Sequence, residues 1–205
     1  MSEMHKPKAV VFDIGRVIIQ WDLRHLYAKL IDDEEELDWF LANVVSERWH
    51  HQQDEGRPLV EMVPERKRQF PEHAALIEAY ATRFNETIPG PVPGTHALIR
   101  KLDAVGVPLF GLSNFGGDFW DAFHADWPVF DAFRDIVVSG HEKCAKPDPE
   151  IYVIAEARFA IPPQNLLFVD DKEDNIAAAR ARGWHGHVFT CANALEADLR
   201  AHGLI

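Results

Sequence analysis

Short, almost wholly apolar stretches alternate with segments of helical periodicity along most of this chain. Strands that are buried on both faces of a parallel sheet are apolar throughout, so each stretch is interpreted as such a strand. The stretches cover Ala9–Ile14, Val107–Leu112, Ile136–Ser139, Leu166–Val169 and His187–Phe189. Because strands and helices alternate after residue 92, the pattern predicts an α/β fold with a doubly wound parallel sheet and right-handed crossovers.

Helices are expected between these strands. They cover Thr95–Val105, Gly116–Ala125, a segment that opens at Asp148-Pro149, and Glu173–Ala181. Asp148 is a favourable N-cap, and Pro149 suits the first helical position. The apolar residues that follow at helical spacing are Ile151, Tyr152, Ala155 and Phe159.

The region between the first strand and residue 91 has a different pattern. Trp21–Glu86 contains no convincing strand, and Leu26, Leu30, Leu37 and Leu41 recur at helical spacing. It ends in 88–94, the segment of the chain richest in Pro and Gly. The sequence therefore predicts a core formed by residues 1–19 and 92–205, with a small helical domain inserted at residues 20–91.

Composition narrows the function classes. The net charge of −12 disfavours binding to nucleic acid or anionic lipid. No apolar run reaches the roughly 18 residues that cross a bilayer. The segment Met1–Lys8 is short and polar and leads into a strand, which favours a cytoplasmic location without a signal peptide. Cys144 and Cys191 do not form a disulfide framework, which agrees with a reducing compartment.

Four short polar sites border the apolar stretches. They are Asp13, Ser113-Asn114, Lys146 and Asp170-Asp171. In open α/β sheets the ligand crevice lies beyond the carboxyl ends of the strands, so these side chains are expected in one pocket. The set suits an anionic substrate held together with a hard divalent cation.

Each site has a chemical and a structural interpretation. Asp13 can attack phosphorus and form an aspartyl-phosphate, or it can cap a turn. The Ser113 hydroxyl and nearby backbone N–H groups can hold phosphoryl oxygens, although the pair Ser113-Asn114 taken alone favours a Ser N-cap or an ordinary turn. Lys146 precedes a proline, so it points from a loop and can offset negative charge. The alternative is a solvent-exposed lysine.

The pair Asp170-Asp171 is the other strong signal. Adjacent carboxylates repel each other unless a cation offsets their charge, and Mg²⁺ takes one or two carboxylates plus substrate phosphate. Asp174 and Asn175 follow at the start of a helix, where they can orient waters or Lys146, cap the helix, or both. We therefore predict Mg²⁺ as cofactor and a small phosphorylated metabolite as substrate.

These motifs resemble those of the haloacid dehalogenase-like hydrolase superfamily, in order and over essentially the whole chain. The resemblance implies a Rossmann-like core with a helical cap. It implies Asp13 as the nucleophile, and Asp13, the Gly15 carbonyl and Asp170 as Mg²⁺ ligands. Ser113, Asn114 and Lys146 would bind phosphate. The phrase Phe12–Ile18 is most similar to sugar-phosphate phosphatases of the glucose-1-phosphate phosphatase type.

Gly15 departs from the family pattern. Most phosphatases of the superfamily carry a second Asp there as general acid/base, which typically contributes about 10²–10⁴-fold. Its loss implies a slow enzyme, a donor from another group, or a good leaving group such as that of a sugar 1-phosphate. The neighbouring Arg16 either adds positive charge near the phosphate or pairs with a surface carboxylate, and we favour the surface pairing.

Two other functions remain open from the sequence. A 2-haloacid dehalogenase also lacks the second Asp, but Asp170-Asp171 would oppose a carboxylate substrate. A binding module that has lost the chemistry is favoured by Gly15 and disfavoured by the presence of Asp13, Lys146 and Asp170. The segment Trp49–Gly56 of the insert either reaches the substrate or forms ordinary surface and core. His185-Gly186-His187 has metal-like spacing but is expected to be a solvated turn that leads into the last strand.

Overall fold

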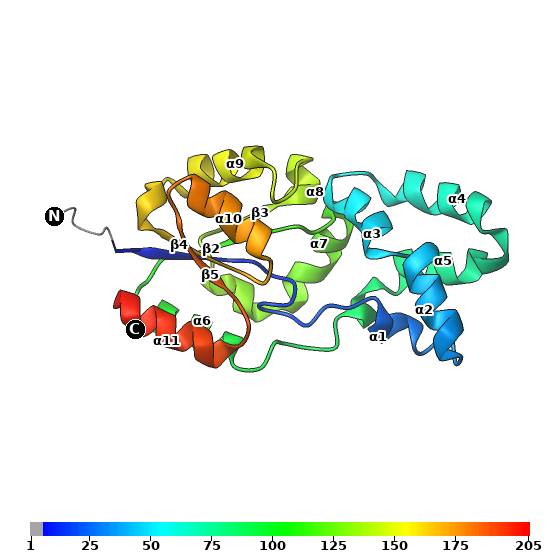
Figure 1. The fold of residues 1–205 in the computed structure, drawn as a ribbon, viewed down its shortest axis with the longest axis horizontal. Coiled ribbons are helices and arrows are strands. Elements are labelled where there is room, and N and C mark those ends of the chain that lie inside the picture. Colours follow the sequence, from blue (N-terminus) through cyan, green and yellow to red (C-terminus); the bar gives the residue numbers. More distant parts are fainter. Residues whose placement is uncertain (1–5) are drawn as a thin grey trace.

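In the computed structural model, which describes residues 6–205, five strands form one parallel sheet in the order β3-β2-β1-β4-β5. The strands are β1 (Ala9–Phe12), β2 (Leu109–Ser113), β3 (Asp135–Val138), β4 (Leu166–Asp170) and β5 (His185–Val188). Every neighbouring pair is parallel and helices cover both faces (Figure 1), which confirms the predicted doubly wound sheet. Most of the segment Met1–Lys8 lies outside the described residues.

Alternate residues of β1 point to opposite faces of the sheet, as strand geometry requires. Val10 and Phe12 belong to the core beneath α6 (Thr95–Ala104) and α11 (Ala192–His202). Ala9 and Val11 belong to a second core, beneath α9 (Pro149–Phe159) and α10 (Glu173–Ala181). Both faces of the central strand are therefore dry, which explains its uninterrupted apolar sequence.

The remaining short elements of the sheet domain lie between these helices and strands. They are α7 (Gly117–Phe123), α8 (Ser139–Glu142) and the 3₁₀ turns η3 (His124–Asp126), η4 (Pro128–Ala132) and η5 (Pro163–Asn165). Asp148 caps α9 by accepting a hydrogen bond from the Glu150 N–H, with Pro149 at the first position, as the sequence predicts.

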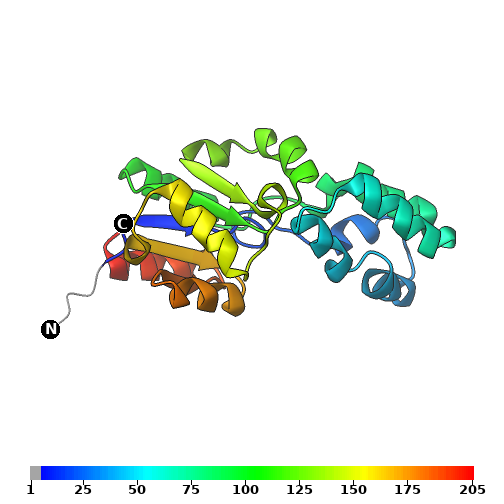
Figure 2. The same cartoon turned by 90° about the horizontal axis from the view of Figure 1, so that it is seen from above.

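Residues 20–91, called the helical region below, form a group of helices at one end of the sheet (Figures 1 and 2). They comprise α1 (Arg24–Tyr27), α2 (Glu34–Asn43), α3 (Glu47–Asp54), α4 (Leu59–Gln69), α5 (Ala74–Thr82), η1 (Pro71–His73) and η2 (Phe84–Thr87). Ile19 forms isolated bridges with both Gly15 and Pro91, so the two connections to the sheet run side by side. One apolar core is continuous from Phe12 to Phe40 of the helical region.

The structure corrects several sequence-based expectations. His185-Gly186-His187 is not a turn, because it forms most of β5. The two imidazoles contact different groups, the Gln164 carbonyl and Asp198, which is why polar residues are tolerated in this half-buried edge strand. Strand limits differ by one to two residues, and α8 and α11 were not predicted. Among residues 6–205 no helix is long and apolar enough to cross a membrane.

Candidate active site

The polar side chains lie together at the carboxyl ends of three strands of the sheet. Asp13 directly follows β1, and its backbone N–H donates to the Val169 carbonyl at 2.8 Å. Ser113 is the last residue of β2, and Asp170 is the last residue of β4. Parallel pairing aligns the ends of β1, β2 and β4, so residues separated by up to 157 positions (13 to 170) meet.

Lys146 connects these strand ends. Its Nζ lies 2.9 Å from Asp13 Oδ1 and 2.7 Å from Asp170 Oδ2, and it donates to the Leu112 carbonyl at 2.8 Å. An ammonium has three donors, so all of them are engaged. Burial lowers the pKa of Lys146, which is 2% exposed, but Asp13 and Asp170 outweigh burial and raise it above its ordinary value. Lys146 therefore stays charged between the two carboxylates.

Asp170 is fully buried, and its neighbours fix it from several sides. Its oxygens accept from the Asn175 side-chain amide at 3.0 Å and from the Lys172 N–H at 2.8 Å, in addition to Lys146. Asn175 thus contacts Asp170 rather than Lys146. Asp174 lines the cavity and accepts no hydrogen bond from the described residues.

Three carboxylates lie close enough to hold a cation. One oxygen from each of Asp13, Asp170 and Asp171 lies within 4.8 Å of the others. Burial, followed by repulsion from Asp170 and Asp171, raises the pKa of Asp13 to about 7 against the attraction of Lys146. Burial and Asp170 also raise the pKa of Asp171, which lines the cavity. This cluster of hard oxygen donors with unfavourable repulsion fits Mg²⁺.

Ser113 and Asn114 have different surroundings although they are adjacent. The Ser113 Oγ is buried and has no hydrogen-bond partner among the described residues. The Asn114 amide donates to the Lys146 carbonyl at 2.9 Å and accepts from the Lys146 N–H at 2.8 Å. Asn114, which lines the cavity described below, therefore fixes the loop that carries Lys146. The Ser113 side chain does not line that cavity, and its buried hydroxyl is left without a partner in the described part of the chain.

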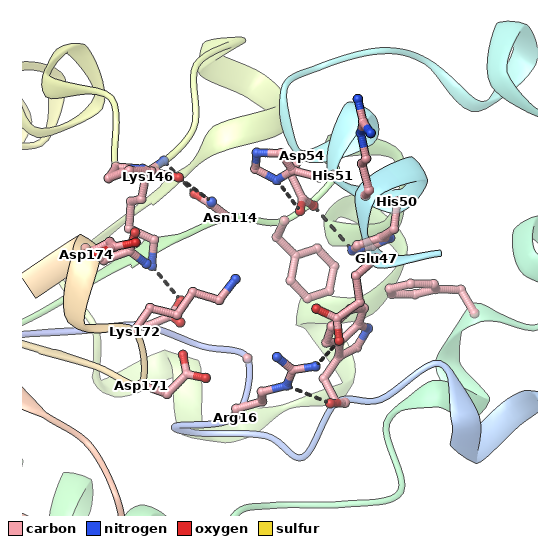
Figure 3. Close-up of a pocket in the computed structure, with 18 residues that line it drawn as sticks. Arg16, Glu47, His50, His51, Asp54, Asn114, Lys146, Asp171, Lys172 and Asp174 are labelled. Carbon is pink, nitrogen blue, oxygen red and sulfur yellow. Dashed lines mark hydrogen bonds and ion pairs between the residues drawn. The ribbon is translucent and has the colours of Figure 1, made fainter. Parts of the chain in front are cut away.

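The helical region provides the opposite wall of a cavity of about 400 Å³ (Figure 3). Helix α3, which begins at an N-cap formed by Ser46, contributes Glu47, Arg48, His50, His51 and Asp54 to this wall. In the segment Trp49–Gly56 only the two histidines and Asp54 line the cavity, whereas Trp49 and Gln53 are buried elsewhere.

The two histidines of this wall differ in their environment. His50 is buried, with Nδ1 2.6 Å from the Tyr80 hydroxyl, and burial lowers its pKa. His51 is 43% exposed, with Nδ1 3.4 Å from Asp54 Oδ2. The hydrogen bond to Asp54 raises the pKa of His51. His51 therefore carries a proton more readily than His50.

Arg16 links the two walls. Its guanidinium pairs with Glu47 of α3 and lies over the Trp21 ring at 5.0 Å. Arg16 also lines the cavity and has a positive φ of 62°. The expected pairing with a carboxylate is present, and the same side chain faces the ligand space.

Sequence reasoning missed several cavity residues. Trp21, Phe84, Phe115 and Lys172 line the cavity together with the residues above. Their sequence neighbourhoods resemble those of ordinary core aromatics and surface lysines, so only the three-dimensional arrangement identifies them.

Carboxylates, a hydroxyl and an ammonium therefore gather at the strand ends of a parallel sheet. This arrangement is typical of a class of hydrolase active sites. Residues 7–183 match the model of the haloacid dehalogenase-like hydrolase family. This chain belongs to that family, which confirms the predicted superfamily and the prediction of a hydrolase.

Known proteins of this family differ in activity. A sesquiterpene phosphatase of Aspergillus oryzae is 28% identical over 200 residues, covering 94% of this chain and 95% of the relative. An (S)-2-haloacid dehalogenase of Pseudomonas putida is 32% identical over 94 residues, only 46% of this chain and 42% of its own.

Solved structures agree on the fold. A family enzyme from Bacteroides thetaiotaomicron superposes with a TM-score of 0.73 at 21% identity, covering 91% of this chain and 95% of the other. That enzyme was also solved with magnesium and inorganic phosphate. At this identity the likeness concerns the fold alone.

Proposed function

We propose that this protein is a Mg²⁺-dependent phosphatase that hydrolyses a small phosphate monoester through an aspartyl-phosphate on Asp13. The observation that carries the proposal is the buried Asp13 carboxylate at the cavity, beside a fixed Lys146 and an unpartnered Ser113 hydroxyl. A phosphoryl group bound there would give that hydroxyl its missing partner.

The steps follow from these residues. Asp13 attacks phosphorus, the ester oxygen leaves, and water then hydrolyses the acyl phosphate. Ser113 donates to a phosphoryl oxygen, and Lys146 offsets negative charge beside the nucleophile. Asn114 acts by fixing Lys146. At the start of α10, Asn175 holds Asp170 by its hydrogen bonds, and Asp174 lines the cavity where it can orient waters.

Asp13, the Gly15 carbonyl and Asp170 are the proposed holders of the cation, with Asp171 close enough to join them. When bound, Mg²⁺ would neutralise charge on the carboxylates and the phosphoryl group. Because an adjacent cation favours the ionised form, it would also lower the pKa of Asp13 from about 7 and leave the nucleophile charged.

The helical region, residues 20–91, is proposed to act as a cap that selects the substrate. It brings Trp21, Phe84 and the α3 histidines over the cavity. A sugar 1-phosphate is the favoured substrate, because its leaving group needs little help at Gly15. The sesquiterpene phosphatase relative and the aromatic lining make a terpenyl phosphate the second substrate class to assay.

The test is hydrolysis of p-nitrophenyl phosphate with Mg²⁺, with EDTA, and by Asp13→Asn. We expect turnover that needs the metal and falls by more than about 10⁴-fold in Asp13→Asn, since the nucleophile is lost. Turnover of 2-haloacids without metal, combined with no phosphatase activity of the folded wild type, would replace this proposal with a dehalogenase.

A further inference from the structure

Gly15 has no side chain that could donate a proton, and the space beside its Cα is open. A Cβ built on Gly15 meets no atom within 4 Å outside its chain neighbours Ile14 and Arg16, so there is room for a side chain to begin there. An alcohol leaving group still requires a proton for fast departure. The donor therefore has to come from elsewhere in the cavity.

In-line displacement restricts where that donor stands. The attacking and leaving oxygens lie on opposite sides of phosphorus. Since Asp13 attacks from the strand ends, the leaving group faces the wall formed by α3 (Figure 3). Asp171 and Asp174 line the opposite side of the cavity, away from α3 (Figure 3).

The α3 wall offers one suitable acid. Arg48 is too basic to give up a proton. Glu47 is paired with Arg16. His50 is buried, with its Nδ1 on Tyr80 and its Nε2 3.5 Å from Asp54 Oδ1, so neither ring nitrogen is free. His51 remains: it is half-exposed, lines the cavity, and its Nδ1 faces Asp54.

We propose that His51, oriented by Asp54, is the general acid/base that replaces the missing Asp at position 15. This inference rests on the phosphatase function proposed above. As Asp13 bonds to phosphorus and the ester P–O bond breaks, the His51 imidazolium gives its proton to the leaving oxygen. Neutral His51 then takes a proton from the water that attacks the acyl phosphate, which releases phosphate and restores both residues.

The charges around His51 favour the proton-carrying form. Asp54, through its hydrogen bond, and Glu55 raise the pKa of His51, whereas burial and Lys172 lower it; His50 lies beside it on the same helix. The donor form is present below the pKa and lost above it. Turnover of substrates with poor leaving groups should therefore fall as pH rises through a value above the ordinary 6.5 of imidazole.

The first test uses His51→Gln with esters of similar shape: p-nitrophenyl, phenyl and benzyl phosphate. The loss relative to wild type should grow as the leaving group worsens, from a few-fold with p-nitrophenyl phosphate to about 10²-fold with benzyl phosphate. His141→Gln is the matched control, because His141 is 44% exposed and lies 3.2 Å from Asp121 outside the cavity. It should match wild type on all three esters.

Two further variants separate proton transfer from a structural role. Asp54→Asn should shift the falling limb of the benzyl phosphate pH profile to lower pH, because the main cause of the raised His51 pKa is removed. Gly15→Asp in the His51→Gln background should restore benzyl phosphate turnover at least 10-fold, since it supplies a carboxyl group in the open space.

An equal loss of activity on all three esters, or no loss, would overturn the role of His51. An unchanged pH limb in folded Asp54→Asn would overturn its orientation by Asp54. Wild-type protein that does not hydrolyse p-nitrophenyl phosphate would overturn the proposed function itself, and this inference with it.

Discussion

The two walls of the cavity are constructed differently. The floor, meaning Asp13, Ser113, Lys146 and Asp170, is buried, and its ion pairs measure 2.7–2.9 Å. Asp13 and Lys146 line the cavity, whereas Ser113 and Asp170 are buried without lining it. The helical wall is formed by α3, where His51 is 43% exposed and its contacts to Asp54 and Glu55 measure 3.4 and 3.8 Å. The side chains of the floor are thus held in place without a ligand, whereas those of the helical wall have room to move.

This difference follows from the elements that carry each wall. Asp13 follows β1, and Ser113 and Asp170 end β2 and β4, so strand register fixes these three side chains relative to one another. Lys146 lies in a loop that is held by hydrogen bonds to Asn114. The helical wall reaches the cavity from a separate group of helices (Figure 2). Electrostatic stabilisation of phosphoryl transfer benefits from rigid groups, whereas adjustable groups suit substrate closure. We infer that the floor supplies the nucleophile and the charges around the phosphoryl group, whereas the helical wall supplies the proposed proton donor and discriminates between substrates.

The largest effect on stability is expected at Lys146. Lys146→Met leaves Asp13 and Asp170 buried without their shared counter-charge. Removal of one partner from a buried ion pair costs about 3–5 kcal/mol, so the free energy of unfolding in urea should fall by that amount. Lowering the pH should reduce the deficit, because protonation of Asp13, whose pKa is already raised, removes the unpaired charge.

Lys101→Met is the control for this change. Lys101 pairs with Glu196 at 2.9 Å, and its side chain is 41% exposed. Exposed pairs contribute little, so the urea transition should stay close to that of wild type. Equal destabilisation by both substitutions would show that the floor is not preorganised in the way its burial indicates.

Ser113→Ala should separate activity from stability. The Ser113 hydroxyl has no partner among the described residues, so its loss leaves no group unsatisfied and the unfolding free energy should stay unchanged. The value of kcat/KM for p-nitrophenyl phosphate should fall by about 10²-fold, because a donor to the phosphoryl group is lost.

Ser139→Ala is the matched comparison, since Ser139 is also buried. Its Oγ accepts from the Phe115 N–H at 3.0 Å, so the substitution leaves that group unpaired. We expect a loss of about 1–3 kcal/mol in unfolding free energy with at most a few-fold change in kcat/KM. The reverse pattern for the two serines would contradict the assigned role of Ser113.

The sequence predicted the sheet well because its strands are buried on both faces. The stretch Ala9–Phe12 has no polar residue, and the following Asp13 therefore stands out. The strand expected from His187 begins two residues after the observed start of β5 at His185. The two polar histidines hide the pattern of this half-buried edge strand. α11 was missed although Leu195 and Leu199, four residues apart, and Gly203 with φ 73° are ordinary signals of a helix and its end.

The floor of the site was more predictable than the helical wall. Each floor residue lies at the end of a strand, directly after one, or in a loop beside the strand ends, so chain order alone brings Asp13, Lys146 and Asp170 together. His51 and Glu47 lie on a helix whose rotation and placement depend on packing of the whole helical region. The sequence indicated the segment Trp49–Gly56, but its packing decides that His51 lines the cavity while Gln53 does not.

The smallest effect is expected at the ion pair that joins the two walls. The Arg16 and Glu47 side chains are 34% and 58% exposed, and such pairs contribute about 0–1 kcal/mol. Glu47→Gln should therefore change the unfolding transition little and kcat/KM for p-nitrophenyl phosphate only a few-fold. Because salt screens exposed charges, this difference from wild type should shrink at high ionic strength. A loss of kcat/KM as large as that in Ser113→Ala, and insensitive to salt, would show that Arg16 and Glu47 belong to the rigid floor. The distinction between the two walls would then be wrong.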